Sequence, residues 1–214
     1  MSKKLYKELL RKLVHLLGLP IITIYSVLHF YWSERVGLLF LAALLLVLLK
    51  IEYIRLEYKI KLPEVLNLFR PREQDHMAGW IFFVSAMIMV FATFDFIIAL
   101  AAILMTIFGD MVAALVGISY GKIKLFRKKT YIGTVSGFAA NILVGFLLLW
   151  TQPLIFIPMA VVASTIELFT NKLDDNLTVP LSAAFAGQTV AAIIVVDTAN
   201  YEHPIMELLM KLSG

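Results

Sequence analysis

The sequence contains no cysteine. This absence excludes disulfide bonds and thiolate metal sites, although it assigns the chain to no compartment. Charged residues are scarce as well, since they make up 16% of the 214 residues while hydrophobic residues make up 61%. A soluble core of this size cannot hide so many apolar side chains. We therefore expect an all-α, polytopic integral membrane protein.

Apolar runs of the length that crosses a bilayer, about 17 to 25 residues, recur along the whole chain. They cover approximately residues 13–32, 36–54, 79–95, 96–119, 132–151, 153–169 and 178–197. No small-residue cleavage site follows the first run, so we expect it to be retained as a helix. The runs predict a single membrane domain over residues 1–214 with about seven transmembrane helices.

The basic residues are distributed unevenly across this arrangement. All of the 19 lysines and arginines except Arg35 and Lys211 fall on the same side of it. The positive-inside rule then predicts a cytoplasmic N-terminus and an exoplasmic C-terminus. Almost no loop separates the two runs that meet near Asp95. If residues 79–119 were a single re-entrant unit, the C-terminus would be cytoplasmic instead.

The most informative stretch runs from Gly109 to Gly137. It contains Asp110, a carboxylate near the end of an apolar run. A charge there is destabilising unless it has partners, and it is expected to have a functional role. Small or polar residues recur there at four-residue spacing: Gly109, Ala113, Gly117 and Gly121 in one run, and Gly133, Gly137, Asn141 and Gly145 in the next. This spacing gives each helix a face that another helix can approach closely, within the chain or in a homo-oligomer. For Asn141, we expect an interhelical hydrogen bond.

A basic segment connects these two runs. Its cations are Lys122, Lys124, Arg127, Lys128 and Lys129. Thr130, Gly133 and Thr134 then open the next run, where the N–H groups of a helix start favour phosphate. Basic loops beside membrane helices are also expected from topology alone. Residues 117–123 do not form a P-loop, because no Ser or Thr follows the lysine and the segment follows a helical run.

Further candidates lie at other ends of the apolar runs. The sixth run ends near Glu167, which is either a site residue or an ordinary helix-end acid. Asp174, Asp175 and Asn176 precede the last run, and oxygen ligands of this kind suit Mg²⁺. Three polar residues remain at other run boundaries. Glu52 is either an inward-facing acid or a polar helix end, and His15 lies four residues after Arg11. His76 lies near Arg70 and Arg72 in a linker that either contacts phosphate or is merely solvated.

Together these residues form a pattern that resembles the CTP-dependent lipid kinase family, which includes dolichol kinase, phytol kinase and the CTP-using diacylglycerol kinase. The first match consists of Asp110, Ala113, Gly117, Gly121, Lys128, Lys129, Thr130 and Gly133. The family usually has a glutamate where this chain has Ile132. The stretch Asp175-Asn176-Leu177 followed by Pro180 is similar to a second family motif, and Arg11 to His15 is similar to a third. The pattern is closest to dolichol kinase.

The resemblance implies transfer of the γ-phosphate of CTP to the hydroxyl of a membrane lipid alcohol, of dolichol or polyprenol type, at the cytoplasmic face. It implies Mg²⁺ as cofactor, and CTP, the lipid alcohol and the bilayer as partners, with no nucleic acid. The implied catalytic residues are Asp110, Lys129, Glu167 and Asp175. The implied nucleotide contacts are Lys122, Lys128, Thr130, Gly133, Thr134, Asn176, Arg11, His15 and His76. The implied metal ligands are Asp110, Asp174, Asp175 and Glu167.

Two other classes of protein fit part of this pattern. A cytidylyltransferase also uses CTP and Mg²⁺ in a membrane, but a lipid phosphate attacks the α-phosphate of CTP and a CDP-lipid results. An ion-coupled transporter would use the membrane acids and glycine-rich helices as an ion site. The two halves of the sequence show no inverted repeat, which argues against the transporter.

Overall fold

The structure is a computed structural model, and it describes residues 16–58, 76–127, 129–170 and 173–194. Within these ranges the chain forms seven α-helices and one antiparallel hairpin of two short strands. The elements are α2 (Gly18–Tyr31), α3 (Glu34–Glu57), α4 (Gly79–Thr93), α5 (Phe96–Tyr120), β1 (Lys124–Phe126), β2 (Lys129–Thr130), α6 (Tyr131–Leu149), α7 (Pro153–Phe169) and α8 (Asp175–Ile193). The expected all-helical fold is confirmed for the described residues.

Local sequence signals set several of these helix boundaries. The Ser33 hydroxyl accepts a hydrogen bond from the Val36 N–H at 3.3 Å and caps the start of α3. Pro153 occupies the first turn of α7, where its missing N–H leaves no hydrogen bond unmade. The α3 and α7 helices therefore begin at residues whose chemistry favours a helix start.

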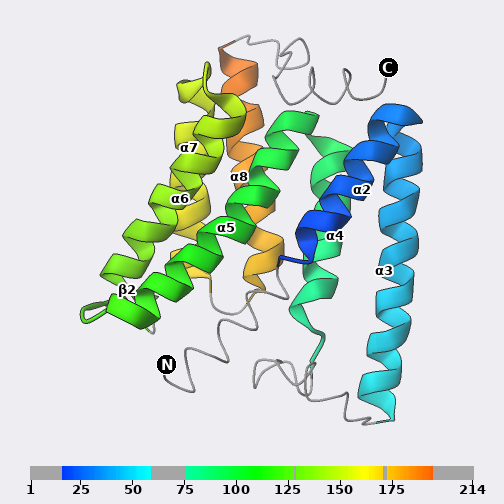
Figure 1. The fold of residues 1–214 in the computed structure, drawn as a ribbon, viewed down its shortest axis with the longest axis horizontal. Helices are drawn as coiled ribbons and strands as arrows, with labels where there is room; N and C mark the ends of the chain where they lie inside the picture. Colours follow the sequence, from blue (N-terminus) through cyan, green and yellow to red (C-terminus); the bar gives the residue numbers. More distant parts are fainter. Residues whose placement is uncertain (1–15, 59–75, 128, 171–172, 195–214) are drawn as a thin grey trace.

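Residues Phe94 and Asp95 alone separate α4 from α5. Gln188 of α8 fixes this turn, because its Nε2 donates to Asp95 Oδ2 at 3.0 Å and its Oε1 accepts from the Asp95 N–H at 3.1 Å. The expected junction near Asp95 thus joins two separate helices, which run in opposite directions (Figure 1).

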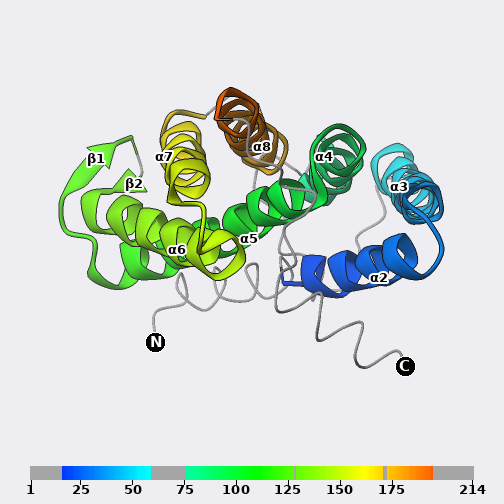
Figure 2. The ribbon, with the colours of Figure 1, turned by 90° about the horizontal axis from the view of Figure 1, so that it is seen from above.

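The helices form two layers, which are clearest from above (Figure 2). One layer contains α7, α8, α4 and α3 in that order, and the other contains α6, α5 and α2. The α5 helix contacts α4, α6, α7 and α8 and is the centre of the bundle. The hairpin lies at the outer edge, where the C-terminal end of α5 meets the N-terminal end of α6.

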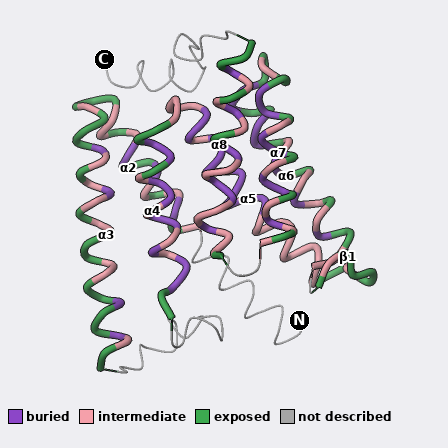
Figure 3. The backbone as a smooth tube through the Cα atoms, turned by 180° about the vertical axis from the view of Figure 1, so that it is seen from behind, coloured by how far each residue is buried: buried purple, intermediate pink, exposed green. Residues whose placement is uncertain are grey.

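Burial follows this arrangement (Figure 3). The first half of α5 is almost fully enclosed, with Ile98, Ala102 and Ile103 completely buried. The α3 helix is the opposite case, since large apolar side chains such as Leu39 and Leu46 are each 68% exposed. Three helices, α3, α5 and α6, are long and apolar enough to cross a membrane by length and composition, and α2, α4 and α7 are shorter apolar helices.

Candidate functional site

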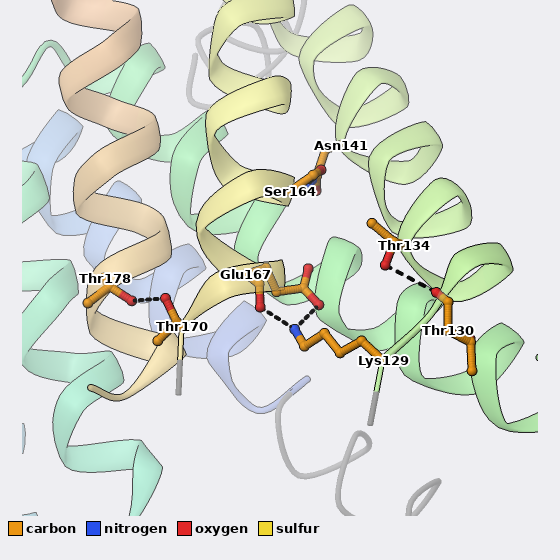
Figure 4. Close-up of polar contacts among 8 residues, drawn as sticks. All are labelled: Lys129, Thr130, Thr134, Asn141, Ser164, Glu167, Thr170 and Thr178. Carbon is orange, nitrogen blue, oxygen red and sulfur yellow. Dashed lines mark hydrogen bonds and ion pairs between the residues drawn. The ribbon is translucent and has the colours of Figure 1, made fainter. Parts of the chain in front are cut away.

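The end of the bundle beside the hairpin brings together residues from two sequence motifs. Lys129 on β2 and Glu167 near the end of α7 are 38 residues apart in the chain. The Lys129 ammonium donates to the Glu167 Oε1 at 2.9 Å and also to the Glu167 carbonyl oxygen (Figure 4). The basic motif and the acid of the sixth apolar run therefore meet in one ion pair.

The two partners of this ion pair differ in exposure. The Lys129 side chain is 33% exposed, whereas that of Glu167 is 10% exposed. A largely buried carboxylate needs a nearby cation, and removing that cation leaves its charge uncompensated. Because Lys129 still reaches solvent, removing one partner should cost less than the roughly 3–5 kcal/mol that breaking a fully buried pair costs.

Thr130 organises the start of α6 beside this pair. Its hydroxyl accepts from the Gly133 N–H at 3.3 Å, and its carbonyl oxygen accepts from the Thr134 hydroxyl at 3.1 Å. The Tyr131 N–H donates to the Ile123 carbonyl oxygen at 3.0 Å. Two N–H groups of the first turn are thus already bonded within the protein, as is the Thr134 hydroxyl. Thr130 acts as the N-cap of α6.

The four-spaced glycines of α5 and α6 face one another. A Cβ added to Gly133 would lie 2.7 Å from the Ala113 carbonyl oxygen and 3.0 Å from the Gly117 Cα. A Cβ on Gly137 would lie 2.8 Å from the Ala113 Cβ. The expected close approach of these two helices is therefore confirmed, and it occurs within one chain. A homo-oligomer would have to use surfaces other than this seam.

Asn141 connects three helices in the middle of the bundle. It is 1% exposed, and its Nδ2 donates to the Ser164 hydroxyl of α7 at 2.9 Å. Its side-chain oxygen is the atom nearest to where a Cβ on Gly109 would lie. The expected interhelical hydrogen bond is confirmed. Asn141 thereby links the turn of α5 next to the partly buried Asp110 with the turn of α7 that precedes Glu167.

The start of α8 lies at the same end of the bundle. The Asp174 side chain accepts from the Asn176 N–H at 3.0 Å and caps the helix. Asp175 is partly buried in the first turn, and Asn176 is buried. The Thr170 and Thr178 hydroxyls lie 3.4 Å apart and connect the end of α7 to α8 (Figure 4). Asp174 therefore has a structural task in addition to any chemical one.

The remaining expected site residues lie elsewhere. Lys122 is exposed just beyond the end of α5, and His76 is exposed just before α4. The α4 helix lies away from the hairpin (Figure 2). Arg11, His15 and Lys128 lie outside the described residues, so the structure does not place them.

The expected metal ligands do not form a ready-made cage. Among the described residues, no three His, Asp or Glu side chains are grouped closely enough to hold a metal ion. Glu167 pairs with Lys129, and Asp174 caps α8. Asp110, in the second half of α5, and Asp175, in the first turn of α8, are partly buried carboxylates. Such a set suits an ion that arrives with substrate phosphates, because Mg²⁺ usually takes only one or two protein carboxylates.

A buried ion pair within α3, which the sequence indicated only through Glu52, bonds to the backbone that precedes α4. Glu52 is 1% exposed and accepts from the Arg55 Nε at 3.0 Å and from the Ala78 N–H at 2.7 Å. Arg55 Nη2 donates to the His76 carbonyl oxygen at 2.8 Å. The three-residue spacing of an acid and an arginine at the end of an apolar helix was the available sequence signal. This pair holds the start of α4.

Comparisons with protein-family models, with curated proteins and with solved structures find no match to this chain.

Proposed function

We propose that the chain is a polytopic integral membrane enzyme with about seven membrane-crossing helices and a cytoplasmic N-terminus and active site. The three helices of sufficient length and apolarity support this placement. Exposed aromatic residues bracket α6, since Tyr131 at its start is 57% exposed and Trp150 just beyond its end is 56% exposed. Tyrosine and tryptophan concentrate at the two interfaces of a membrane, so their exposure at both ends of α6 supports the proposed crossing.

The reaction we propose is transfer of the γ-phosphate of CTP to the hydroxyl of a membrane lipid alcohol of dolichol or polyprenol type. The contact between Lys129 and Glu167 is the observation that carries this proposal. It joins the lysine of the motif Lys128-Lys129-Thr130 to an acid that the resemblance also assigns to the site. The starts of α6 and α8 lie at the same end of the bundle, as expected if both contribute to one site.

Lys129 is suited to bind a terminal phosphate. An ammonium group has three N–H donors, and Glu167 accepts two of them. The third can donate to a phosphate oxygen and offset the charge that develops during transfer. The Thr130 hydroxyl, which accepts a bond from Gly133, can still donate its own proton to the nucleotide.

In the proposed step, the lipid hydroxyl oxygen attacks the γ-phosphorus in line, and the bond to the β–γ bridging oxygen breaks to release CDP. One of the three carboxylates Asp110, Glu167 and Asp174 accepts the hydroxyl proton. Asp110 and Asp175 would hold Mg²⁺ that enters with CTP. The bound ion would supply charge neutralisation at the phosphates.

The identity of the transferred group tests this proposal. Purified protein is given CTP labelled at either the α- or the γ-phosphate, together with Mg²⁺ and extracted lipids. We expect label in the lipid only from the γ position, together with release of CDP. Lipid that carries the α label, with pyrophosphate as the second product, would instead identify a cytidylyltransferase.

A substitution at the proposed metal ligand, Asp110→Asn, tests the same proposal. The substitution is nearly isosteric, so the fold should persist while a metal ligand and a possible base are lost. We expect most of the turnover to disappear with little change in melting temperature. Near-normal turnover would remove Asp110 from the site.

A further inference from the structure

The hairpin divides its side chains into an anchored set and an outward set. The anchored set consists of three residues. The Phe126 ring meets the Phe169 ring of α7 edge-on with centroids 5.3 Å apart, Lys129 pairs with Glu167, and the Thr130 hydroxyl caps α6. These contacts attach the hairpin to the ends of α6 and α7, so the orientation of its outer surface is fixed by packing.

The outward set combines cations with large apolar side chains. Ile123 is 72% exposed and Leu125 is 47% exposed, and Lys124 and Arg127 are exposed as well. The β1–β2 register is irregular between Lys124 and Phe126, so exposure, not strand alternation, assigns these four residues to the outer surface. The sequence from Gly121 to Thr130 contains no acid, so the outer surface carries charge of only one sign.

The position of the hairpin in the bundle indicates what lies next to its outer surface. The hairpin joins α5 to α6, and both helices are long and apolar enough to cross a membrane. Tyr120 at the end of α5 is 70% exposed and Tyr131 at the start of α6 is 57% exposed, which is typical of residues at headgroup level. Figures 1 and 2 show the hairpin projecting sideways from the edge of the bundle. In the proposed membrane placement, lipid headgroups lie beyond this edge at this level.

We propose that the outer hairpin surface, defined as Ile123, Lys124, Leu125 and Arg127, docks on the headgroups of anionic lipids. The two apolar side chains insert between headgroups, and the two cations lie over the lipid phosphates. Clusters of basic residues beside membrane helices bind anionic cytoplasmic leaflets in this way. The inference rests on the membrane placement of the proposed function, but it needs neither CTP nor catalysis. The proposal assigns different roles to the cations of the hairpin: Lys129 belongs to the candidate site, whereas Lys124 and Arg127 contact the bilayer.

The absence of cysteine makes a direct test possible. The full chain carrying Leu125→Cys is labelled with an environment-sensitive fluorophore and placed in nanodiscs of phosphatidylcholine alone or mixed with phosphatidylglycerol. A nitroxide on the lipid headgroup serves as the quencher. We expect a blue-shifted emission and at least severalfold stronger quenching in the anionic discs. Ile123→Cys, at the neighbouring exposed apolar position, repeats the measurement if Leu125→Cys folds poorly.

The charge-removed control is Lys124→Gln with Arg127→Gln in the same labelled chain, which should abolish the difference between the two lipid compositions. Equal quenching in both compositions, or no effect of these two substitutions, would overturn the proposal. A signal that responds to CTP with Mg²⁺ and not to anionic lipid would also overturn it, because the surface would then face the nucleotide.

A second label separates failure of docking from failure of the membrane placement. Leu154 is 66% exposed in the first turn of α7, at the end of the bundle opposite the hairpin. If Leu154→Cys is quenched and Leu125→Cys is not, the chain is in the membrane and the docking proposal is wrong. If neither label is quenched, the membrane placement fails and the docking proposal fails with it.

Discussion

At the scale of single residues, the five cations of the connecting segment are not equivalent. Among the described ones, Lys129 is partly buried and bonded to Glu167, whereas Lys122, Lys124 and Arg127 are exposed. Arg127 has a positive φ of 52°, which is unfavourable for a side chain of this size, and its guanidinium carbon lies 5.1 Å from the centre of the Phe126 ring. Neighbouring residues of one charge thus have different surroundings and different expected tasks.

Lys129→Ala should lower kcat/KM for CTP by on the order of 100-fold, because one preorganised donor to the transferring phosphate is lost. Lys124→Ala is the matched control on the same hairpin, and its effect should be much smaller, since Lys124 is exposed and has no contact with Glu167 among the described interactions. The measurement is transfer of γ-label from CTP to lipid. Equal, small effects of both substitutions would indicate that the basic segment reflects only membrane topology.

At the scale of elements, two kinds of contact hold the helices in register. The α5–α6 seam consists of backbone and small side chains, so it tolerates little added volume. The α3–α4 connection instead depends on the buried pair of Glu52 and Arg55, which also binds the backbone of His76 and Ala78. The seam responds to volume and the ion pair responds to charge, so a substitution can test each one separately.

Gly133→Ala should destabilise the protein by roughly 1–3 kcal/mol, because the new methyl group would collide with the backbone of α5 and force the helices apart. The control is Ala139→Val, which adds volume at an exposed position of the same helix. The measurement is the melting temperature of the purified proteins in detergent. A Gly133→Ala protein as stable as the parent would show that α5 and α6 are not packed this closely.

Glu52→Gln should destabilise the protein by roughly 3–5 kcal/mol, since it removes the carboxylate charge that pairs with the buried guanidinium of Arg55. Glu57→Gln removes the same charge from an exposed position near the end of the same helix and should change the melting temperature little. If the two variants melt alike, the ion pair does not hold α3 against α4.

At the scale of the whole molecule, the bundle has two chemically different ends. The hairpin, the ion pair of Lys129 and Glu167, and the start of α8 lie at one end, and the short turn at Phe94 and Asp95 lies at the other. Consecutive helices are joined at alternating ends in Figure 1. This alternation agrees with the proposed placement of the basic segments on a single side of the membrane.

Single cysteines test the orientation of the chain, because the parent has none. A membrane-impermeant maleimide applied to intact cells should leave Lys124→Cys unlabelled and should label Gly214→Cys. Labelling of both after permeabilisation is the control for reactivity. Protection of Gly214→Cys in intact cells would contradict the arrangement of seven crossings, and labelling of Lys124→Cys would reverse the proposed orientation.

The sequence by itself determined the helical fold and the approach of α5 to α6. Both depend on local periodicity: apolar runs form helices, and small residues four positions apart must share one helix face. The same reasoning anticipated the hydrogen bond of Asn141, since a buried amide needs a partner. For these features, the spacing within a single segment was enough.

Only the tertiary structure decided which helix ends converge. It paired Lys129 with Glu167 across 38 residues, and it left Lys124 exposed although both lysines belong to one basic segment. It also joined Glu52 to the N–H of Ala78, 26 residues further along the chain. Such contacts depend on how whole helices are stacked. The local periodicity that fixes each helix contains no information about its neighbours at a distance in the sequence.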